Sequence, residues 1–211
     1  MNSLNVKENH RFHNIAGVIL AGGASKRFNG IIKAKIIIDG DTIISRIIDI
    51  MDELFGEIII VTNSPCEFKE FNSCKIIGDT FLNKGPLGGI HSAIRNSSCD
   101  ALFFVAADMP LLDKEIIIKQ IEYFNDNNFE VLIPRIDHLT EPLHGIYKKS
   151  LLIKLEEYLE VETDYSVSAF LKKTDVNYLQ YEESEKTRRA FFNINLPSDI
   201  DIVSSLLTLA K

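Results

Sequence analysis

The chain has 211 residues, of which 45% are hydrophobic and 25% are charged. This length suffices for one domain with a sizeable core and argues against two. The formal net charge of −7 argues against a general nucleic-acid-binding surface. No apolar stretch approaches the length of a membrane helix, which predicts that the chain does not enter a membrane. Any anion site must therefore be local, built from a few cations and backbone N–H groups.

The first fourteen residues, MNSLNVKENHRFHN, are polar and lack the apolar core of a secretory signal. We expect a flexible N-terminal arm over residues 1–14 and a single domain over residues 15–211. Three cysteines, Cys66, Cys74 and Cys99, make an odd number and form no CxxC motif. This usage favours a cytoplasmic protein with reduced thiols.

Short apolar runs alternate with helical patterns along most of the chain. The runs predict strands at residues 15–21, 34–38, 57–62, 74–77, 101–106, 130–134 and 143–147. Apolar residues at helical spacing predict helices at residues 43–54, 87–94, 113–124, 151–159, 166–172 and 197–210. Asp41 or Thr42 is expected to cap the first helix and Asp113 the third. Residues 181–189 (YEESEKTRR) are expected to form a charged surface stretch.

This alternation predicts the fold class: a three-layer α/β/α domain with a mostly parallel, Rossmann-like central sheet. In such sheets, ligands bind beyond the carboxyl ends of the strands. Three loops, at residues 22–33, 79–89 and 108–110, each follow a predicted strand. We expect all three to open at the same edge of the sheet.

The first loop, GGASKRFNGIIK, lacks both the GK[ST] ending of a Walker A loop and the GxGxxG dinucleotide fingerprint. Gly22 and Gly23 let the backbone approach a ligand closely, and consecutive N–H groups can form an anion nest. Arg27 and Lys33 can neutralise phosphate oxygens. A glycine turn with solvated surface cations explains this loop, taken alone, equally well.

The other two loops are each ambiguous when taken alone. Asp108 follows the strand at 101–106, and an acid at that edge suits Mg²⁺, which takes one or two carboxylates and completes its shell with phosphate and water. The alternative is that Asp108 caps a turn before Pro110. Gly85 and Pro86 stand at a helix start, where backbone N–H groups bind anions, but a tight loop is the simpler interpretation.

Taken together, four segments resemble the molybdenum cofactor guanylyltransferases, nucleotidyltransferases with a glycosyltransferase-A-like fold. They are LAGGASKRF with Lys33 downstream, GPLGG, ADMP and FFNINLPSDI. The resemblance runs from Ile15 to the last predicted helix. It implies transfer of GMP from Mg²⁺–GTP to the terminal phosphate of molybdopterin (the molybdenum cofactor), with release of pyrophosphate. It also implies transient contact with cofactor-delivery proteins or molybdoenzymes.

The resemblance also assigns roles to individual residues. Arg27, Lys33 and Asp108 would be catalytic, with the two cations stabilising the triphosphate and Asp108 holding Mg²⁺. Nucleotide binding would fall to Leu20, Ala21, Gly22, Gly23, Lys33, Asp79, Gly85, Pro86 and Asp108. Asn83 is an alternative to Asp79.

Asn195 would be a second metal ligand, and Glu141, His144 and Asn193 would lie toward the pterin. Simpler explanations exist for these positions. Asn favours turns and caps, and a histidine on a strand is more often a hydrogen-bonded structural residue. Lys186, Arg188 and Arg189 could reach the pterin phosphate, although a charge run is usually a solvated face.

The sequence departs from the family pattern at several positions. Phe28–Asn29 replaces methionine–glycine, Ile32 stands where many relatives carry an acid before the lysine, and Leu196 replaces a threonine. The loss of the acid before Lys33 removes a partner that would orient that lysine.

Three alternatives remain open at this stage. Cytidylyl and adenylyl relatives tend to read LAAG where this chain has Gly22, and discrimination by one small residue is modest, so a cytidylyltransferase of the same fold is the nearest rival. A non-catalytic nucleotide or cofactor sensor would bind nucleotide without releasing pyrophosphate. A structural interaction protein would explain the three clustered loops least well.

Overall fold

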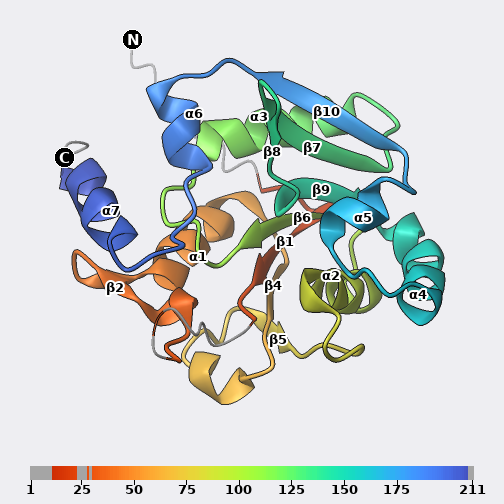
Figure 1. Cartoon of the computed structure of the whole chain (residues 1–211), viewed down its shortest axis with the longest axis horizontal. Helices are drawn as coiled ribbons and strands as arrows, with labels where there is room; N and C mark the ends of the chain where they lie inside the picture. Colours follow the sequence, from red (N-terminus) through yellow and green to blue (C-terminus); the bar gives the residue numbers. More distant parts are fainter. Residues whose placement is uncertain (1–10, 23–27, 29, 209–211) are drawn as a thin grey trace, which may run out of the picture.

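The structure is a computed structural model, and it describes residues 11–22, 28 and 30–208. A central sheet lies between two layers of helices (Figure 1). The strand order is β10-β7-β9-β6-β1-β4-β5, with β8 paired to β7. The strands of this sheet are β1 (Ile15–Leu20), β4 (Ile58–Val61), β5 (Lys75–Ile77), β6 (Ala101–Ala106), β7 (Val131–Ile136), β8 (Leu139–Thr140), β9 (His144–Lys148) and β10 (Val176–Tyr181).

The pairing is mostly parallel. β1 pairs in parallel with β4 and with β6, β4 with β5, and β7 with β10. β9 runs antiparallel to both β6 and β7. The predicted α/β fold with a mostly parallel sheet is therefore confirmed. A separate two-stranded sheet joins β2 (Ile37–Ile38) to β3 (Asp41–Thr42).

Helices cover both faces of the sheet. They are α1 (Ile43–Leu54), α2 (Gly85–Asn96), α3 (Lys114–Asn125), α4 (Leu152–Val161), α5 (Val167–Leu171), α6 (Glu185–Ala190) and α7 (Asp199–Thr208), with 3₁₀ turns η2 (Lys33–Lys35), η3 (Pro65–Phe68) and η4 (Lys149–Leu151). Thr42 accepts the backbone N–H of Ser45, and Asp113 accepts that of Ile116, so the predicted caps of α1 and α3 are confirmed.

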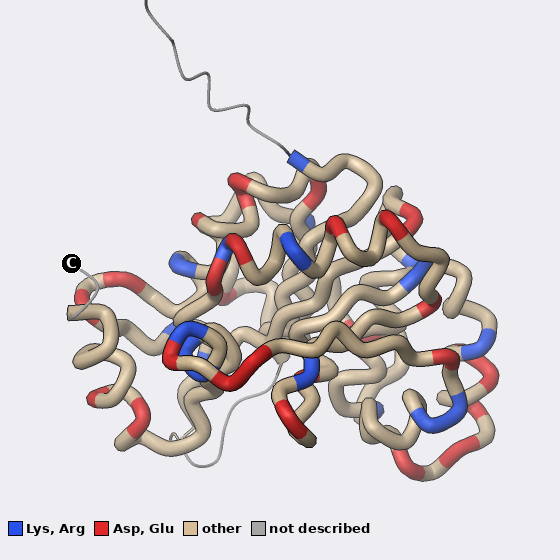
Figure 2. The backbone as a smooth tube through the Cα atoms, turned by 90° about the horizontal axis from the view of Figure 1, so that it is seen from above, with Lys and Arg blue, Asp and Glu red and all other residues tan. Residues whose placement is uncertain are grey.

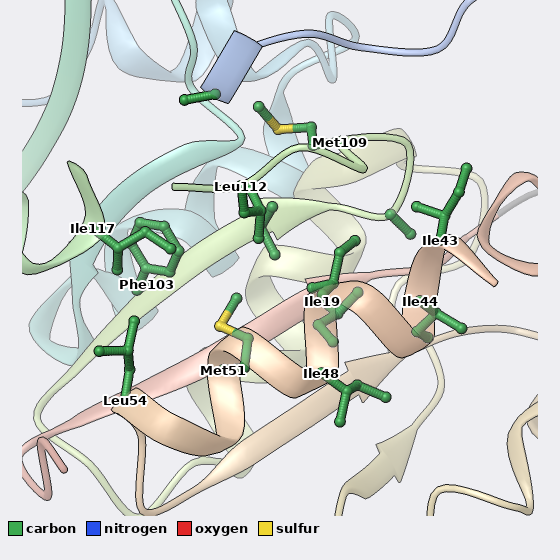
Figure 3. Close-up of a cluster of buried hydrophobic side chains, with 14 of the residues drawn as sticks. Ile19, Ile43, Ile44, Ile48, Met51, Leu54, Phe103, Met109, Leu112 and Ile117 are labelled. Atoms are coloured by element: carbon green, nitrogen blue, oxygen red, sulfur yellow. The ribbon is translucent and has the colours of Figure 1, made fainter. Parts of the chain in front are cut away.

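Alternating side chains divide the core into two clusters. Ile15 and Ile19 of β1 pack in the cluster that includes residues of α1 and α3. Ala16 and Val18 point to the other face, in the cluster with α2, α4 and α5. Figure 3 shows α1 laying its apolar side chains toward β1 and β6. Because both faces of these strands are buried, the strands read as continuous apolar runs in the sequence.

Two parts of the secondary structure differ from the sequence-based expectation. Residues 34–38, predicted as extended, are split between η2 and β2. The stretch 181–189 contains the end of β10 and the short helix α6, in which Ser184 and Thr187 form a capping box. β10 escaped prediction because it is half-exposed at the sheet edge and carries polar residues, so it lacks an apolar run.

The domain also begins before Ile15. Phe12 forms a bridge with Phe55, donating its N–H to the carbonyl of Leu54 at 2.6 Å and accepting from the N–H of Gly56 at 3.1 Å. Part of the predicted N-terminal arm, at Phe12, is therefore docked on the domain by backbone hydrogen bonds. Residues 1–10 lie outside the described residues.

Charges of both signs interleave along the backbone (Figure 2). Among the described residues, no helix combines the length and the apolar character needed to cross a membrane.

Candidate active site

A pocket of about 530 Å³ opens at the carboxyl edge of the parallel strands. All three predicted loops contribute to it, so the expectation that they share one edge is confirmed. Every described residue predicted to bind nucleotide lines this pocket: Leu20, Ala21, Gly22, Lys33, Asp79, Gly85, Pro86 and Asp108. Gly23 and Arg27 lie outside the described residues, so the anion nest and the role of Arg27 stay predictions.

One end of the pocket holds an ion pair. Lys33 Nζ donates to Asp108 Oδ2 at 2.8 Å and to the carbonyl oxygen of Ile194 at 2.6 Å. The Lys33 and Asp108 side chains are only 21% and 22% exposed. Phe28, which replaces the family's methionine, is buried and places its ring centroid 5.8 Å from Nζ. We call Lys33, Asp108 and the Ile194 carbonyl the charged corner.

Lys33 is oriented by its partners in the charged corner, and not by the residue before it, which here is the uncharged Ile32. Ile32 lines the pocket and offers no charge to its neighbour. The carbonyl of Ile194, in the FFNINLP segment, accepts a hydrogen bond from the Lys33 ammonium and so orients it. The backbone N–H of Ile194 also donates to the carbonyl of Asp108 at 2.9 Å. A segment 161 residues downstream of Lys33 thus fixes both members of the ion pair.

The opposite end of the pocket holds a second carboxylate with a neutral partner. Asn63 Nδ2 donates to Asp79 Oδ2 at 2.8 Å, and the Asp79 backbone N–H donates to Asn63 Oδ1 at 3.0 Å. We call this pair the amide corner. Sequence reasoning missed Asn63. The available signal was its position two residues beyond β4, at the same carboxyl edge as the predicted loops.

The start of α2 forms the wall between the two corners. Gly85 has a φ of +57°, which favours glycine, and both Gly85 and Pro86 line the pocket. A Cβ on Gly89 would meet Leu20 Cδ2 at 3.0 Å, so glycine lets this helix approach the pocket floor closely. Asn83 and Asp79 both line the pocket, so contact of either one with the nucleoside stays a prediction.

His144 is not a substrate-lining residue, which corrects the prediction. Its side chain is fully buried, with its ring edge-on to Phe103 and Phe191 at centroid distances of 5.0 and 4.8 Å. Burial lowers the pKa of His144 to about 4, so the ring is neutral near pH 7. The histidine belongs to the core behind the charged corner.

Glu141 and Asn193 lie together beside the charged corner. Burial raises the pKa of Glu141 and the negative charge of Asp108 raises it further, while a hydrogen bond from the Asn193 side chain opposes the shift. Asn195 is exposed, and its backbone N–H donates to Asp199 Oδ2 at 2.7 Å. Asn195 is not part of the pocket wall, and its metal-binding role stays a prediction.

The predicted charge run at 181–189 pairs largely within itself and with α3. Arg188 Nη2 lies 2.7 Å from Glu183 Oε1, and Lys186 Nζ lies 3.4 Å from Asp113 Oδ2. A larger hollow of about 810 Å³ is lined by residues of α1, α6 and α7, and Lys186 and Asp113 are among its lining residues. It contains none of the predicted nucleotide-binding residues, all of whose described members line the smaller pocket.

Asp108 fits the donor set of a Mg²⁺ site that is completed by substrate. Within the described part of the chain, no group of three or more His, Cys, Asp or Glu side chains is arranged to hold a metal. Mg²⁺ commonly uses one or two carboxylates, with phosphate oxygens and water filling the rest of its shell. A single partly exposed carboxylate at the pocket wall suits that arrangement.

Comparisons with known proteins agree with one another. A family model described as "MobA-like NTP transferase domain" matches residues 17–178. A "Probable molybdenum cofactor guanylyltransferase" of Natranaerobius thermophilus is 32% identical over 197 residues, covering 89% of this chain and 94% of that protein. A protein of the same description from Clostridium perfringens is 34% identical over 186 residues, covering 85% and 91%.

The fold matches as well. The crystal structure of "Molybdopterin-guanine dinucleotide biosynthesis protein A" from Archaeoglobus fulgidus has a TM-score of 0.77 at 23% identity, covering 92% of this chain and 99% of that one. The family model spans most of this chain and the two relatives cover nearly all of it. The chain therefore belongs to the MobA-like NTP transferase family of nucleotidyltransferases.

Proposed function

We propose that this enzyme transfers GMP from GTP to the terminal phosphate of molybdopterin and releases pyrophosphate. An oxygen of the acceptor phosphate forms a bond to the α-phosphorus as the bond from that phosphorus to the departing pyrophosphate breaks. Both substrates are polyanions, so the protein's task is to align them and neutralise their charge. No protein nucleophile is required.

The Lys33–Asp108 pair at one end of the pocket carries this proposal. Lys33 supplies an ammonium to phosphate oxygens, and Arg27 adds a second cation from the same loop. The N-terminus of α2 contributes backbone N–H groups such as that of Gly85, where anions are stabilised, whereas Pro86 has no N–H to donate. Asp108 would hold Mg²⁺, which when bound neutralises developing charge on the phosphates.

The amide corner supports guanine as the base. The Watson–Crick edge of guanine presents two N–H donors side by side, and the Asp79 carboxylate is a pure acceptor. Asn63 holds that carboxylate at the pocket wall. Glu141 and Asn193, beside the charged corner, are proposed to face the pterin substrate. Names of the relatives, which specify guanylyl transfer, support the same choice.

Cytosine is the second candidate base: Gly22 favours guanine, but discrimination by one small residue is modest. A Cβ built on Gly22 meets no atom of the described residues within 4 Å, so that part of the chain does not require glycine there. Selectivity at this position would come from the space that glycine leaves for the base. A cytidylyltransferase would keep the same charged corner and the same reaction.

The deciding experiment measures pyrophosphate release from GTP and from CTP, each with Mg²⁺, with and without molybdopterin. We expect release from GTP that depends on molybdopterin. Release from CTP alone would overturn the choice of base. Binding of GTP with no release of pyrophosphate from either nucleotide would overturn the enzyme proposal in favour of a sensor.

A further inference from the structure

The ammonium of Lys33 lies against the same carboxylate that the proposed function gives to a divalent metal. Nζ is 2.8 Å from Asp108 Oδ2, and the two side chains are about one-fifth exposed. At this distance a unit positive charge cancels much of the attraction that the carboxylate offers a metal ion. Lys33 and a metal therefore compete for one partner in the nucleotide-free protein.

We propose that Lys33 is a built-in counterion that keeps divalent metal off Asp108 until a nucleotide triphosphate enters the pocket. The inference rests on the proposed function. The triphosphate carries more negative charge than Asp108 and draws the ammonium toward itself, which frees the carboxylate for the metal. Metal and triphosphate then bind cooperatively, and each raises the affinity of the other by the same factor.

The backbone around the charged corner is suited to this exchange. The N–H of Ile194 donates to the main-chain carbonyl of Asp108 at 2.9 Å, so the backbone at Asp108 is held by a bond that does not involve Lys33. The carbonyl of Ile194 accepts from Lys33 at 2.6 Å and offers the ammonium one neutral acceptor that the metal does not contest. The backbone at Asp108 is therefore held in the same way whichever cation its carboxylate faces.

The neighbouring Lys35 provides a matched control. It belongs to the same 3₁₀ turn, η2, but its ammonium is bound to Glu70 and lies 5.4 Å from the ring centroid of Phe68. Removing Lys35 subtracts the same unit charge from the same turn and leaves the charged corner intact.

The test is a Mn²⁺ titration followed by electron paramagnetic resonance, with no nucleotide or pterin present. The proteins are wild type, Lys33→Met, Lys35→Met and the double variant Lys33→Met/Asp108→Asn, with Lys33→Gln as a second replacement should the methionine variant not fold. We expect Lys33→Met to bind Mn²⁺ about tenfold more tightly than wild type, as removal of an adjacent unit charge predicts. Lys35→Met and the double variant should bind as weakly as wild type.

Each other result overturns the proposal. Equal Mn²⁺ affinity of wild type and Lys33→Met would show that Lys33 does not exclude metal. A gain that persists in the double variant would place the metal away from Asp108. An equal gain in Lys35→Met would reduce the effect to net charge. Because these titrations contain no substrate, they can fail or succeed independently of guanylyl transfer.

A second arm tests the triphosphate half of the exchange, using inorganic tripolyphosphate in the presence of a metal chelator. Asp108→Asn releases Lys33, so this variant should bind tripolyphosphate more tightly than wild type, and the gain should vanish when Lys33→Met is added. A gain that survives without Lys33 would mean that Asp108 merely repels the anion, and would overturn the proposed exchange.

Discussion

The two ends of the pocket use the same type of residue in different ways. Each contains an aspartate that follows a parallel strand, Asp108 after β6 and Asp79 after β5. Asp108 faces an ammonium, whereas Asp79 faces the neutral amide of Asn63. An ion pair suits the exchange of charged ligands, and an amide pair holds an acceptor in a fixed orientation for reading N–H donors. We propose that the partner of each carboxylate, more than its position, decides whether it serves the reaction or the recognition of the base.

The largest expected effect is at the charged corner. Asp108→Asn should lower the turnover number roughly a thousandfold, because the amide cannot replace a carboxylate in holding a metal against the triphosphate. Pyrophosphate release measures this effect. The melting temperature should shift by less than about 3 °C, because a partly exposed ion pair contributes little stability. Turnover at the wild-type level would remove Asp108 from the mechanism.

At the amide corner, the expected effect is on base selectivity. Asp79→Asn should lower the preference for GTP over CTP roughly ten- to hundredfold, because guanine loses a charged acceptor. The ratio of kcat/KM for the two nucleotides measures this change, and kcat at saturating GTP should change little. A loss of kcat as large as that of Asp108→Asn would mean that Asp79 serves the reaction and not only the recognition of the base.

A smaller effect is expected at Gly22, between the corners. Gly22→Ala adds a methyl group to the pocket wall, and that Cβ has no neighbour within 4 Å among the residues that the structure describes. We expect selectivity for GTP over CTP to fall by up to about tenfold, the lower end of what one methylene group discriminates. Competition assays with both nucleotides measure this change. An unchanged ratio would show that the base does not contact this part of the loop.

The smallest effect on turnover is expected at His144, behind the charged corner. His144→Leu should leave activity at neutral pH unchanged, because the ring is buried and neutral. Its effect is on stability. Burial lowers the pKa of His144 to about 4, whereas the unfolded value is 6.5. Between these two pH values, His144 is protonated in the unfolded chain and stays neutral in the folded chain.

The free energy of unfolding should fall with this protonation by up to ~3 kcal/mol between pH 6.5 and 4, and the leucine variant should lack this part of the decline. Urea unfolding of both proteins across that range measures the difference. A pH dependence identical in both would contradict the burial of His144, and a loss of activity at neutral pH would return it to the site.

Much of the parallel part of the fold follows from local sequence. β1, β4 and β6 are apolar throughout because helices cover both faces, so their positions are evident from composition alone. The alternation of strands with helices fixed the expectation that Asp108, Gly22 and Gly85 would share an edge. The sequence predicted Thr42 and Asp113 as helix caps because a capping side chain bonds a backbone N–H only a few residues away.

Contacts between segments that are distant in the chain could not be predicted from local sequence. The hydrogen bonds from Lys33 to Ile194 and from Asn63 to Asp79 join residues whose meeting depends on how the strands are ordered in the sheet. β10 and α6 were missed for a related reason. β10 is stabilised at the sheet edge by β7, and α6 by burial of Thr187 and Ala190, and neither has a strong local signal.

The sequence by itself determined the class of fold, the edge that carries the site and most of the residues that line it, because the apolar period and the loop residues are local properties of the chain. Only the tertiary structure decided what each residue does there. It moved His144 from the site into the core, paired Asp79 with Asn63, and placed the carbonyl of Ile194 beside Lys33. Burial and hydrogen-bond partners depend on side chains brought together from distant positions, and no local pattern encodes them.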